Sequence, residues 1–214
     1  MIVIIQKKLK IYNYFFYIII DMKKIIFLFS GQSKTNSLSY NFYTNSNILK
    51  SYSKNIFTKE FKNIYDYTIF ISTDHINIDN TINFFGKDKI SNIHQLVTNY
   101  YYKDISNYIP KLFYFLDNGI LTEKEYYILD VFNLLVNYNN IDCDYIIRIN
   151  FDTEINDNIF NYINMIDSSD CDIIYKSDFM IAKPIVKNYY CNIMNNKKFA
   201  KFDIFNEYKS KKIL

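Results

Sequence analysis

Acidic and amide side chains follow one apolar segment of the sequence at a spacing suited to binding a metal ion. The segment DYIIRI, residues 144–149, is followed directly by Asn150, Asp152 and Glu154. Carboxylate and amide oxygens bind hard divalent cations, and such an ion can neutralise charge that develops on a phosphate leaving group. We therefore expect the carboxylates of this loop, Asp152 and Glu154, to offer a site for a divalent cation such as Mg²⁺ or Mn²⁺, with Asp152 as the leading candidate. The alternative is an acidic cap on the helix expected to follow.

Two further loops have side chains that suit a nucleotide. The loop after the apolar segment KIIFLFS provides a hydroxyl, a tight turn, an amide and a cation from Ser30, Gly31, Gln32 and Lys34. Asp74, which follows the segment YTIFIS, is able to accept a hydrogen bond from a ribose hydroxyl or a base. We expect these residues to bind the nucleotide. An ordinary loop at the first position and a local turn at the second are the alternatives.

Arg148 is the only arginine of the chain. The sequence is rich in residues with A/T-rich codons, and every other cationic position is lysine. One hypothesis is that Arg148 belongs to the ligand site, because that site needs a planar fork of donors that lysine cannot supply. Chance survival of one arginine codon is the alternative.

Apolar runs and helical periodicities alternate along the chain. Continuous apolar runs predict buried strands over residues 24–30, 67–72 and 144–149, and helical spacing predicts helices over 48–64, 122–138, 157–166 and 184–194. Shorter strands are expected at residues 90–93, 172–175 and 179–182. This alternation predicts an α/β fold, a mostly parallel doubly wound sheet with helices on both faces. Ligands of such sheets bind outside the carboxyl ends of the strands, so Gly31, Asp74 and Asp152 should surround one cleft.

The 214 residues suffice for one domain. We assign residues 22–196 to it, residues 1–21 to an apolar extension that need not belong to the fold, and residues 197–214 to a basic tail without an assigned role. The apolar run at residues 11–20 is about half the length that spans a bilayer, so no transmembrane span is expected. Weak membrane association through the N-terminus is the alternative.

The amino-acid composition indicates which binding partners and which compartment suit the protein. The net charge of +3 and the pI near 8.5 come from dispersed lysines and do not indicate nucleic-acid binding. The three cysteines lack the spacing of a disulfide framework or a zinc site, which favours a reducing compartment, the cytoplasm of a bacterium or of a virus-infected host.

Four segments carry a resemblance to a known family. KKIIFLFSGQ, FIST, CDYIIRINFDTEI and SDFMIAKPIVKNYY, within residues 22–195, resemble GT-A-type glycosyltransferases of bacterial and large-virus genomes. The resemblance implies a GT-A, Rossmann-like fold, with Asp152 as the second acid of a D-x-D metal motif and Arg148 inside the preceding strand. It also implies that Asp178 and residues 179–182 form a wall of the sugar pocket. Asn150 stands where the family has the first acid of this motif, so the resemblance implies a second metal ligand there that is neutral and weaker than a carboxylate.

The expected function is transfer of a sugar from a nucleoside-diphosphate donor to a glycan, lipid or protein acceptor. Asp178 is the candidate to orient the sugar or the acceptor and the candidate catalytic residue. The alternative is a catalytically inactive binding or interaction module of the same fold, which Asn150 and the short C-terminal region favour. An unrelated flavodoxin-like domain is a third alternative, although its phosphate loop is normally richer in glycine.

Overall fold

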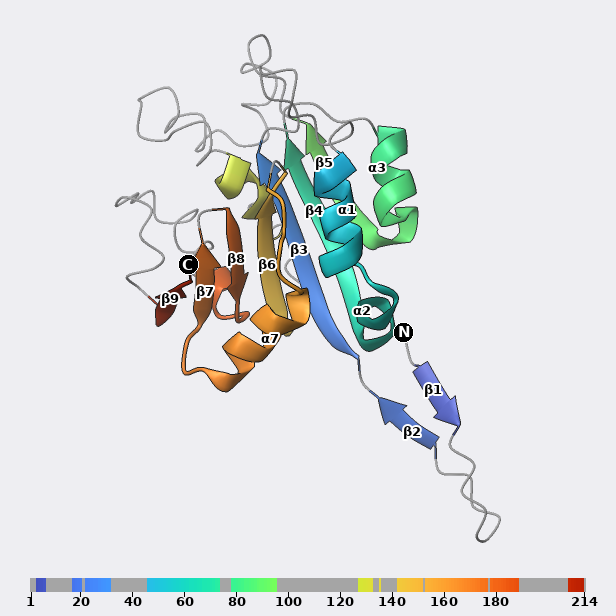
Figure 1. The fold of residues 1–214 in the computed structure, drawn as a ribbon, viewed down its shortest axis with the longest axis vertical. Coiled ribbons are helices and arrows are strands. Elements are labelled where there is room, and N and C mark those ends of the chain that lie inside the picture. The colour runs from blue at the N-terminus through green and yellow to red at the C-terminus, as the bar shows by residue number, and fades with distance from the viewer. Residues whose placement is uncertain are drawn as a thin grey trace, which may run out of the picture.

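A seven-stranded sheet forms the centre of the structure, a computed structural model (Figure 1). Residues 3–6, 17–20, 22–31, 46–73, 78–95, 127–132, 135, 142–151, 153–176, 178–188 and 208–213 are described. The strand order is β5-β4-β3-β6-β8-β7-β9. The bounds are β3 Lys23–Gly31, β4 Tyr65–Thr73, β5 Ile90–Gln95, β6 Tyr145–Asn150, β7 Ile173–Lys176, β8 Phe179–Ala182 and β9 Ser210–Lys212. All neighbouring pairs are parallel except the two that involve β8, which confirms the predicted mostly parallel α/β sheet.

The helices were predicted correctly in part. They are α1 Ser46–Asn55, α2 Lys59–Ile64, α3 Ile78–Phe85 and α7 Ile159–Ser168, with a short 3₁₀ helix η1 at Lys87–Lys89. The single helix predicted over 48–64 is two helices. Thr58 causes the break, because its hydroxyl accepts a hydrogen bond from the Phe61 amide and caps the start of α2. Residues 127–132 of the helix predicted over 122–138 are helical, as are residues 186–188 of the last predicted helix.

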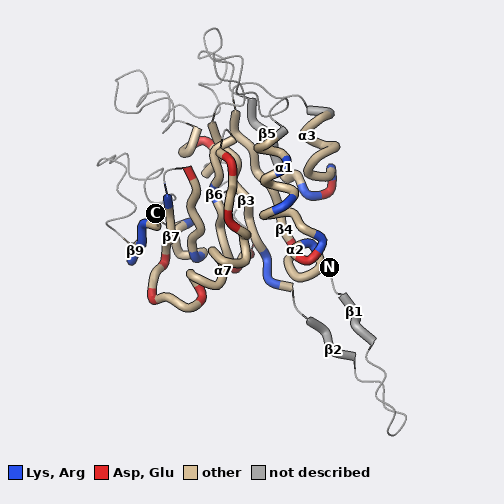
Figure 2. Tube along the Cα trace, viewed as in Figure 1, with Lys and Arg blue, Asp and Glu red and all other residues tan. Residues whose placement is uncertain are grey.

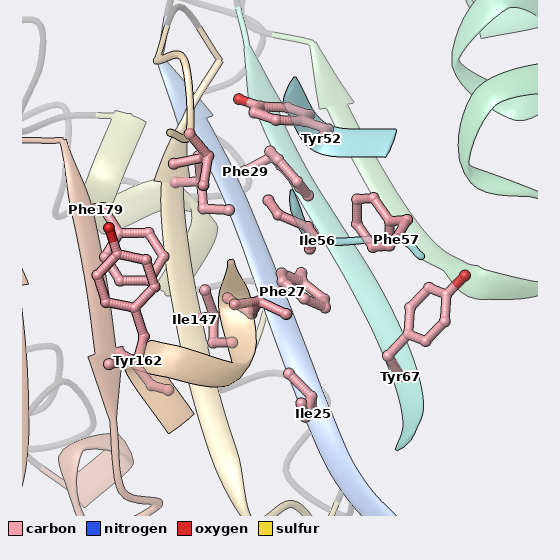
Figure 3. Close-up of a cluster of buried hydrophobic side chains, with 14 of the residues drawn as sticks. Ile25, Phe27, Phe29, Tyr52, Ile56, Phe57, Tyr67, Ile147, Tyr162 and Phe179 are labelled. Carbon is pink, nitrogen blue, oxygen red and sulfur yellow. The ribbon is translucent and has the colours of Figure 1, made fainter. Parts of the chain in front are cut away.

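The side chains of the central strands alternate between two faces of the sheet, and one of these faces is rich in aromatic residues. The odd-numbered apolar side chains of β3, β4 and β6 belong to one buried cluster, which also includes residues of α1, α2, α3 and α7. Figure 3 shows Phe27 and Phe29 projecting from β3 toward Tyr52, Ile56 and Phe57. Because successive side chains of a strand point to opposite faces, the even-numbered residues lie on the other face. On that face Ser72 donates a hydrogen bond to Asp130, which places helical residues 127–132 there. The described helices therefore lie on both faces.

The C-terminal region differs from the expectation of a tail outside the domain. Residues 210–212 form β9, which pairs in parallel with β7 at the edge of the sheet. Its register brings Ser210 beside Ile173, and the Asp172 amide donates to the Lys209 carbonyl. The sequence did not reveal this strand because Ser210–Lys212 has no apolar run, although lysine is common on edge strands.

The two N-terminal strands lie apart from the seven-stranded sheet. β1, Val3–Gln6, and β2, Tyr17–Ile20, pair antiparallel with each other in a separate two-stranded sheet (Figure 1). In the described part of the chain, no helix is both long and apolar enough to cross a membrane. Figure 2 shows charged residues of both signs dispersed over the helices, loops and strand ends.

A polar cluster joins β3, β6 and α7 at the amino ends of the parallel strands. Lys23 Nζ donates to the Tyr145 hydroxyl at 2.7 Å and pairs with Asp167 at 3.1 Å, and the Tyr145 hydroxyl donates to Asp167. Burial, reinforced by the bond to Asp167, raises the pKa of Tyr145 to about 12. The cluster fixes the register of β3 and β6 at the edge opposite their carboxyl ends.

Candidate functional site at the carboxyl edge of the sheet

The carboxyl ends of β3 and β6 form the point where the strand order reverses. After β3 the chain forms β4 and β5 on one side of it, and then crosses to β6 on the other side. Ligands of open α/β sheets bind outside the carboxyl ends of the strands at such a reversal. The register pairs Ser30 with Asn150 and Gly31 with Thr73, so the polar ends of three strands lie side by side. Gln32, Lys34, Asp74 and Asp152 lie outside the described residues, and their predicted roles stay predictions.

Three polar side chains are neighbours on the face opposite the aromatic core. Ser72, Ser30 and Asn150 occupy paired positions on β4, β3 and β6, and none is more than 5% exposed. Ser72 donates to the carboxylate of Asp130, which is fully buried. The Ser30 hydroxyl has no hydrogen-bond partner within the described part of the molecule. A buried polar atom left unpaired is costly, so a partner that arrives with a ligand would stabilise this edge.

Gly31 ends β3 with a backbone conformation that side chains rarely adopt. Its φ is 107°, and a Cβ placed there would have no atom of the described residues within 4 Å. Glycine is favoured here by its dihedral angle, because side-chain-bearing residues rarely adopt a positive φ.

Arg148, Asn150 and Asp178 form a connected chain of hydrogen bonds. Arg148 Nη1 donates to Asn150 Oδ1 at 2.7 Å, and Asn150 Nδ2 donates to Asp178 Oδ1 at 2.8 Å. The Asn150 amide nitrogen also donates to the Asp178 carbonyl at 3.0 Å. Because β8 runs antiparallel to β6, its first residues lie beside the last residues of β6. The reversal of β8 thus brings Asp178 to the same edge as Ser30 and Gly31.

The amide orientation of Asn150 decides how well it suits a metal ion. A guanidinium only donates hydrogen bonds and a carboxylate only accepts them, so the amide oxygen must face Arg148 and the amide nitrogen must face Asp178. The oxygen that would coordinate a cation is therefore bonded to a cationic side chain. The metal-ligand role expected of Asn150 stays a prediction, and it would require this oxygen to give up its bond to Arg148. Within the described residues there is also no cluster of three or more histidine, cysteine or acidic side chains arranged to hold a metal ion.

Helix α1 anchors the loop that follows β6. The Tyr52 hydroxyl donates to the Asn150 carbonyl at 3.2 Å, and the Ser51 hydroxyl accepts from the Ile155 amide at 3.1 Å. Asn55 donates to the Ile155 carbonyl. These three helical residues hold both ends of the segment that contains Asp152 and Glu154. The sequence did not indicate this anchor, because Ser51 and Asn55 are ordinary residues of a polar helix.

Replacing Ser51 by alanine is expected to lower the free energy of unfolding by about 1–2 kcal/mol, because it leaves the Ile155 amide without a partner. Urea denaturation measures the change. Ser53→Ala is the matched control, since Ser53 is exposed on the same helix and its loss should change stability by less than about 0.5 kcal/mol. Equal effects of the two changes would contradict the anchoring role.

Ser72 and Asp130 were not among the site residues predicted from the sequence. Ser72 ends the apolar segment YTIFIS, and Asp130 interrupts the apolar stripe of a predicted helix. An acid on the buried stripe of a helix signals a partner inside the fold, because unpaired carboxylates are rarely buried. The sequence therefore indicated that Asp130 has a buried partner, but it did not indicate that the partner is Ser72.

No family model matches the chain, and no curated protein matches it either. Among solved structures, a cytidylyltransferase from Leptospira borgpetersenii serovar Hardjo-bovis (strain JB197) is similar, at 11% sequence identity and a TM-score of 0.41. The match covers 90% of this chain and 76% of the cytidylyltransferase. The strand order and register by themselves define the class, an α/β protein whose mostly parallel sheet gathers polar residues at the carboxyl edge.

Proposed function

We propose that this protein is a glycosyltransferase that moves a sugar from a nucleoside-diphosphate donor to an acceptor hydroxyl. The observation that carries the proposal is the junction of β3 and β6, where Ser30, Gly31 and Asn150 meet at the reversal of strand order. Asp178 reaches the same edge from β8. The resemblance of the surrounding segments to GT-A-type glycosyltransferases supplies the reaction class.

In this proposal the loop after β3 binds the nucleotide. Gly31 carries no side chain and lies beside the buried Ser30 hydroxyl, which has no hydrogen-bond partner among the described residues. Gln32 and Lys34 would contribute an amide and a cation, and Asp74 would accept a hydrogen bond from the ribose.

The sugar would lie near Asp178. A carboxylate accepts hydrogen bonds from sugar hydroxyls and repels phosphate, so this end of the site suits the sugar or the acceptor. In the reaction the bond from the anomeric carbon to the diphosphate oxygen breaks, and the acceptor oxygen forms the new bond as it loses its proton. Asp178 is the proposed acceptor of that proton. Asp152 would hold a Mg²⁺ or Mn²⁺ ion, which would supply charge neutralisation at the diphosphate leaving group.

The second candidate is a binding module of the same fold without transferase activity. The observation that favours it is Asn150, a neutral residue whose amide is bonded at both ends within the protein. Such a module would bind a nucleotide or nucleotide sugar and leave it intact.

Ligand-induced stabilisation and turnover together test these proposals. A ligand that binds only the folded state raises the unfolding free energy by RT ln(1 + [L]/Kd), about 2.7 kcal/mol at a concentration of 100 Kd. We expect at least one nucleoside diphosphate or nucleotide sugar of a panel to raise the midpoint of thermal unfolding by several degrees. With the matching acceptor, wild type should release nucleoside diphosphate.

Asp178→Ala should abolish turnover, whereas Asp170→Ala should not, because Asp170 is exposed and pairs only with surface Lys209 among the described residues. Stabilisation without turnover would favour the binding module. No stabilisation by any member of the panel would refute both proposals.

A further inference from the structure

The side chain of Asn150 connects a buried cation to a carboxylate. Arg148 is 6% exposed and Asn150 is 5% exposed, so neither can exchange its protein partner for bulk water. Arg148 donates to one end of the amide, and the other end donates to Asp178. The amide therefore acts as a neutral spacer that satisfies a donor on one side and an acceptor on the other.

We propose that Arg148 and Asn150 are positioning residues that aim the carboxylate of Asp178 into the site. We infer further that position 150 serves this bridge in place of binding a metal ion. The main chain supports the same arrangement, because the Asn150 amide nitrogen donates to the Asp178 carbonyl and fixes the residue at the start of β8. Arg148 acts on the site through Asn150, to which its Nη1 atom donates.

Replacing Asn150 by an acid distinguishes the bridging role from a metal-ligand role, because the two roles predict opposite effects. Asn150→Asp recreates the first acid of the D-x-D pattern, so a metal-binding role predicts tighter, Mn²⁺-dependent nucleotide binding. The bridge predicts the opposite. Aspartate would still accept from Arg148, but it would turn a carboxylate oxygen toward Asp178 at the 2.8 Å contact and lose the donated hydrogen bond.

The exchanged pair restores the bridge. In the double variant Asn150→Asp with Asp178→Asn, aspartate accepts from Arg148 and also accepts from the new amide at position 178. The number of hydrogen bonds and the net charge match those of the natural protein. A merely steric role of Asn150 gives no reason for such recovery, because each single change already preserves side-chain size.

Thermal unfolding of the ligand-free full-length protein measures the bridge directly. Asn150→Asp is expected to lower the midpoint by about 3–10 °C, and the exchanged pair should recover at least half of that loss. Asn164→Asp is the control, since Asn164 is exposed in the middle of α7 and its change should stay within about 1–2 °C. An unchanged midpoint for Asn150→Asp, or no recovery in the exchanged pair, would overturn the bridge.

Nucleotide binding provides the second readout, and this part alone rests on the proposed function. For a nucleotide identified by the panel above, Asn150→Asp should bind at least tenfold more weakly, with or without Mn²⁺. The exchanged pair should remain impaired in turnover despite its recovered stability, because the carboxylate is no longer at position 178. Tighter Mn²⁺-dependent binding by Asn150→Asp would overturn the inference. Failure of every nucleotide to bind would refute the proposed function, while the unfolding data would still decide the bridge.

Discussion

Replacing Phe29 by alanine is expected to lower the free energy of unfolding by about 3–5 kcal/mol. Phe29 is fully buried in β3, and its ring centroid lies 5.0 Å from that of Phe85 and 5.6 Å from those of Tyr52 and Phe151. The substitution removes a large apolar side chain and leaves a cavity between strands and helices. Since domains are typically stable by about 5–15 kcal/mol, the loss is a large part of the total.

Urea denaturation at several protein concentrations measures this loss. Ile64→Ala is the control, because Ile64 is 44% exposed at the end of α2 and should lose less than about 1 kcal/mol. Phe29 directly precedes Ser30, so the substitution should also weaken the nucleotide binding proposed above. A loss below about 1 kcal/mol for Phe29→Ala would show that this cluster does not form the core.

Replacing Arg148 by methionine should produce the other large effect, a loss of about 2–4 kcal/mol in the free energy of unfolding. Methionine keeps most of the side-chain length and removes the donor to Asn150 Oδ1. The buried amide oxygen then loses its partner, and Asp178 loses the cation connected to it through Asn150. Removing one member of a buried polar network lowers stability, because the remaining polar groups are left unpaired and out of contact with water.

Arg148→Lys distinguishes charge from geometry. Lysine retains the charge and one donor but lacks the planar fork, so we expect an intermediate loss of about 1–2 kcal/mol. Lys62→Met, at an exposed position of α2, should have little effect. Unchanged stability and ligand binding in Arg148→Lys would show that the single arginine of the sequence has no special role.

Local patterns predicted the interior strands well. The continuous apolar runs around Phe27, Ile69 and Ile147 correspond to β3, β4 and β6, and the central residues of these strands are buried. Burial on both faces favours apolar residues at most positions of a strand, and such a run is visible in the sequence without knowledge of neighbours. The polar residues that end these strands were also identifiable, because each apolar run stops where the strand stops.

Partners distant along the chain were not predictable in the same way. The bond between Asn150 and Asp178 depends on β8 running antiparallel to β6, and the bond between Ser72 and Asp130 joins residues 58 positions apart. The break before α2 depends on whether the Thr58 hydroxyl caps a new turn. A short strand such as β9 has no apolar run of its own and forms because β7 offers it an edge.

The sequence by itself therefore determined the fold class, the buried strands and the candidate polar ends at Ser30, Gly31 and Asn150, because burial and periodicity are recorded residue by residue. Only the tertiary structure decided which groups these residues face. Strand order and direction bring the side chain of Asn150 between those of Arg148 and Asp178, with a hydrogen bond to each. The physical reason is that a hydrogen bond needs a donor and an acceptor within about 3 Å, and for residues far apart in the chain this distance is set by sheet register.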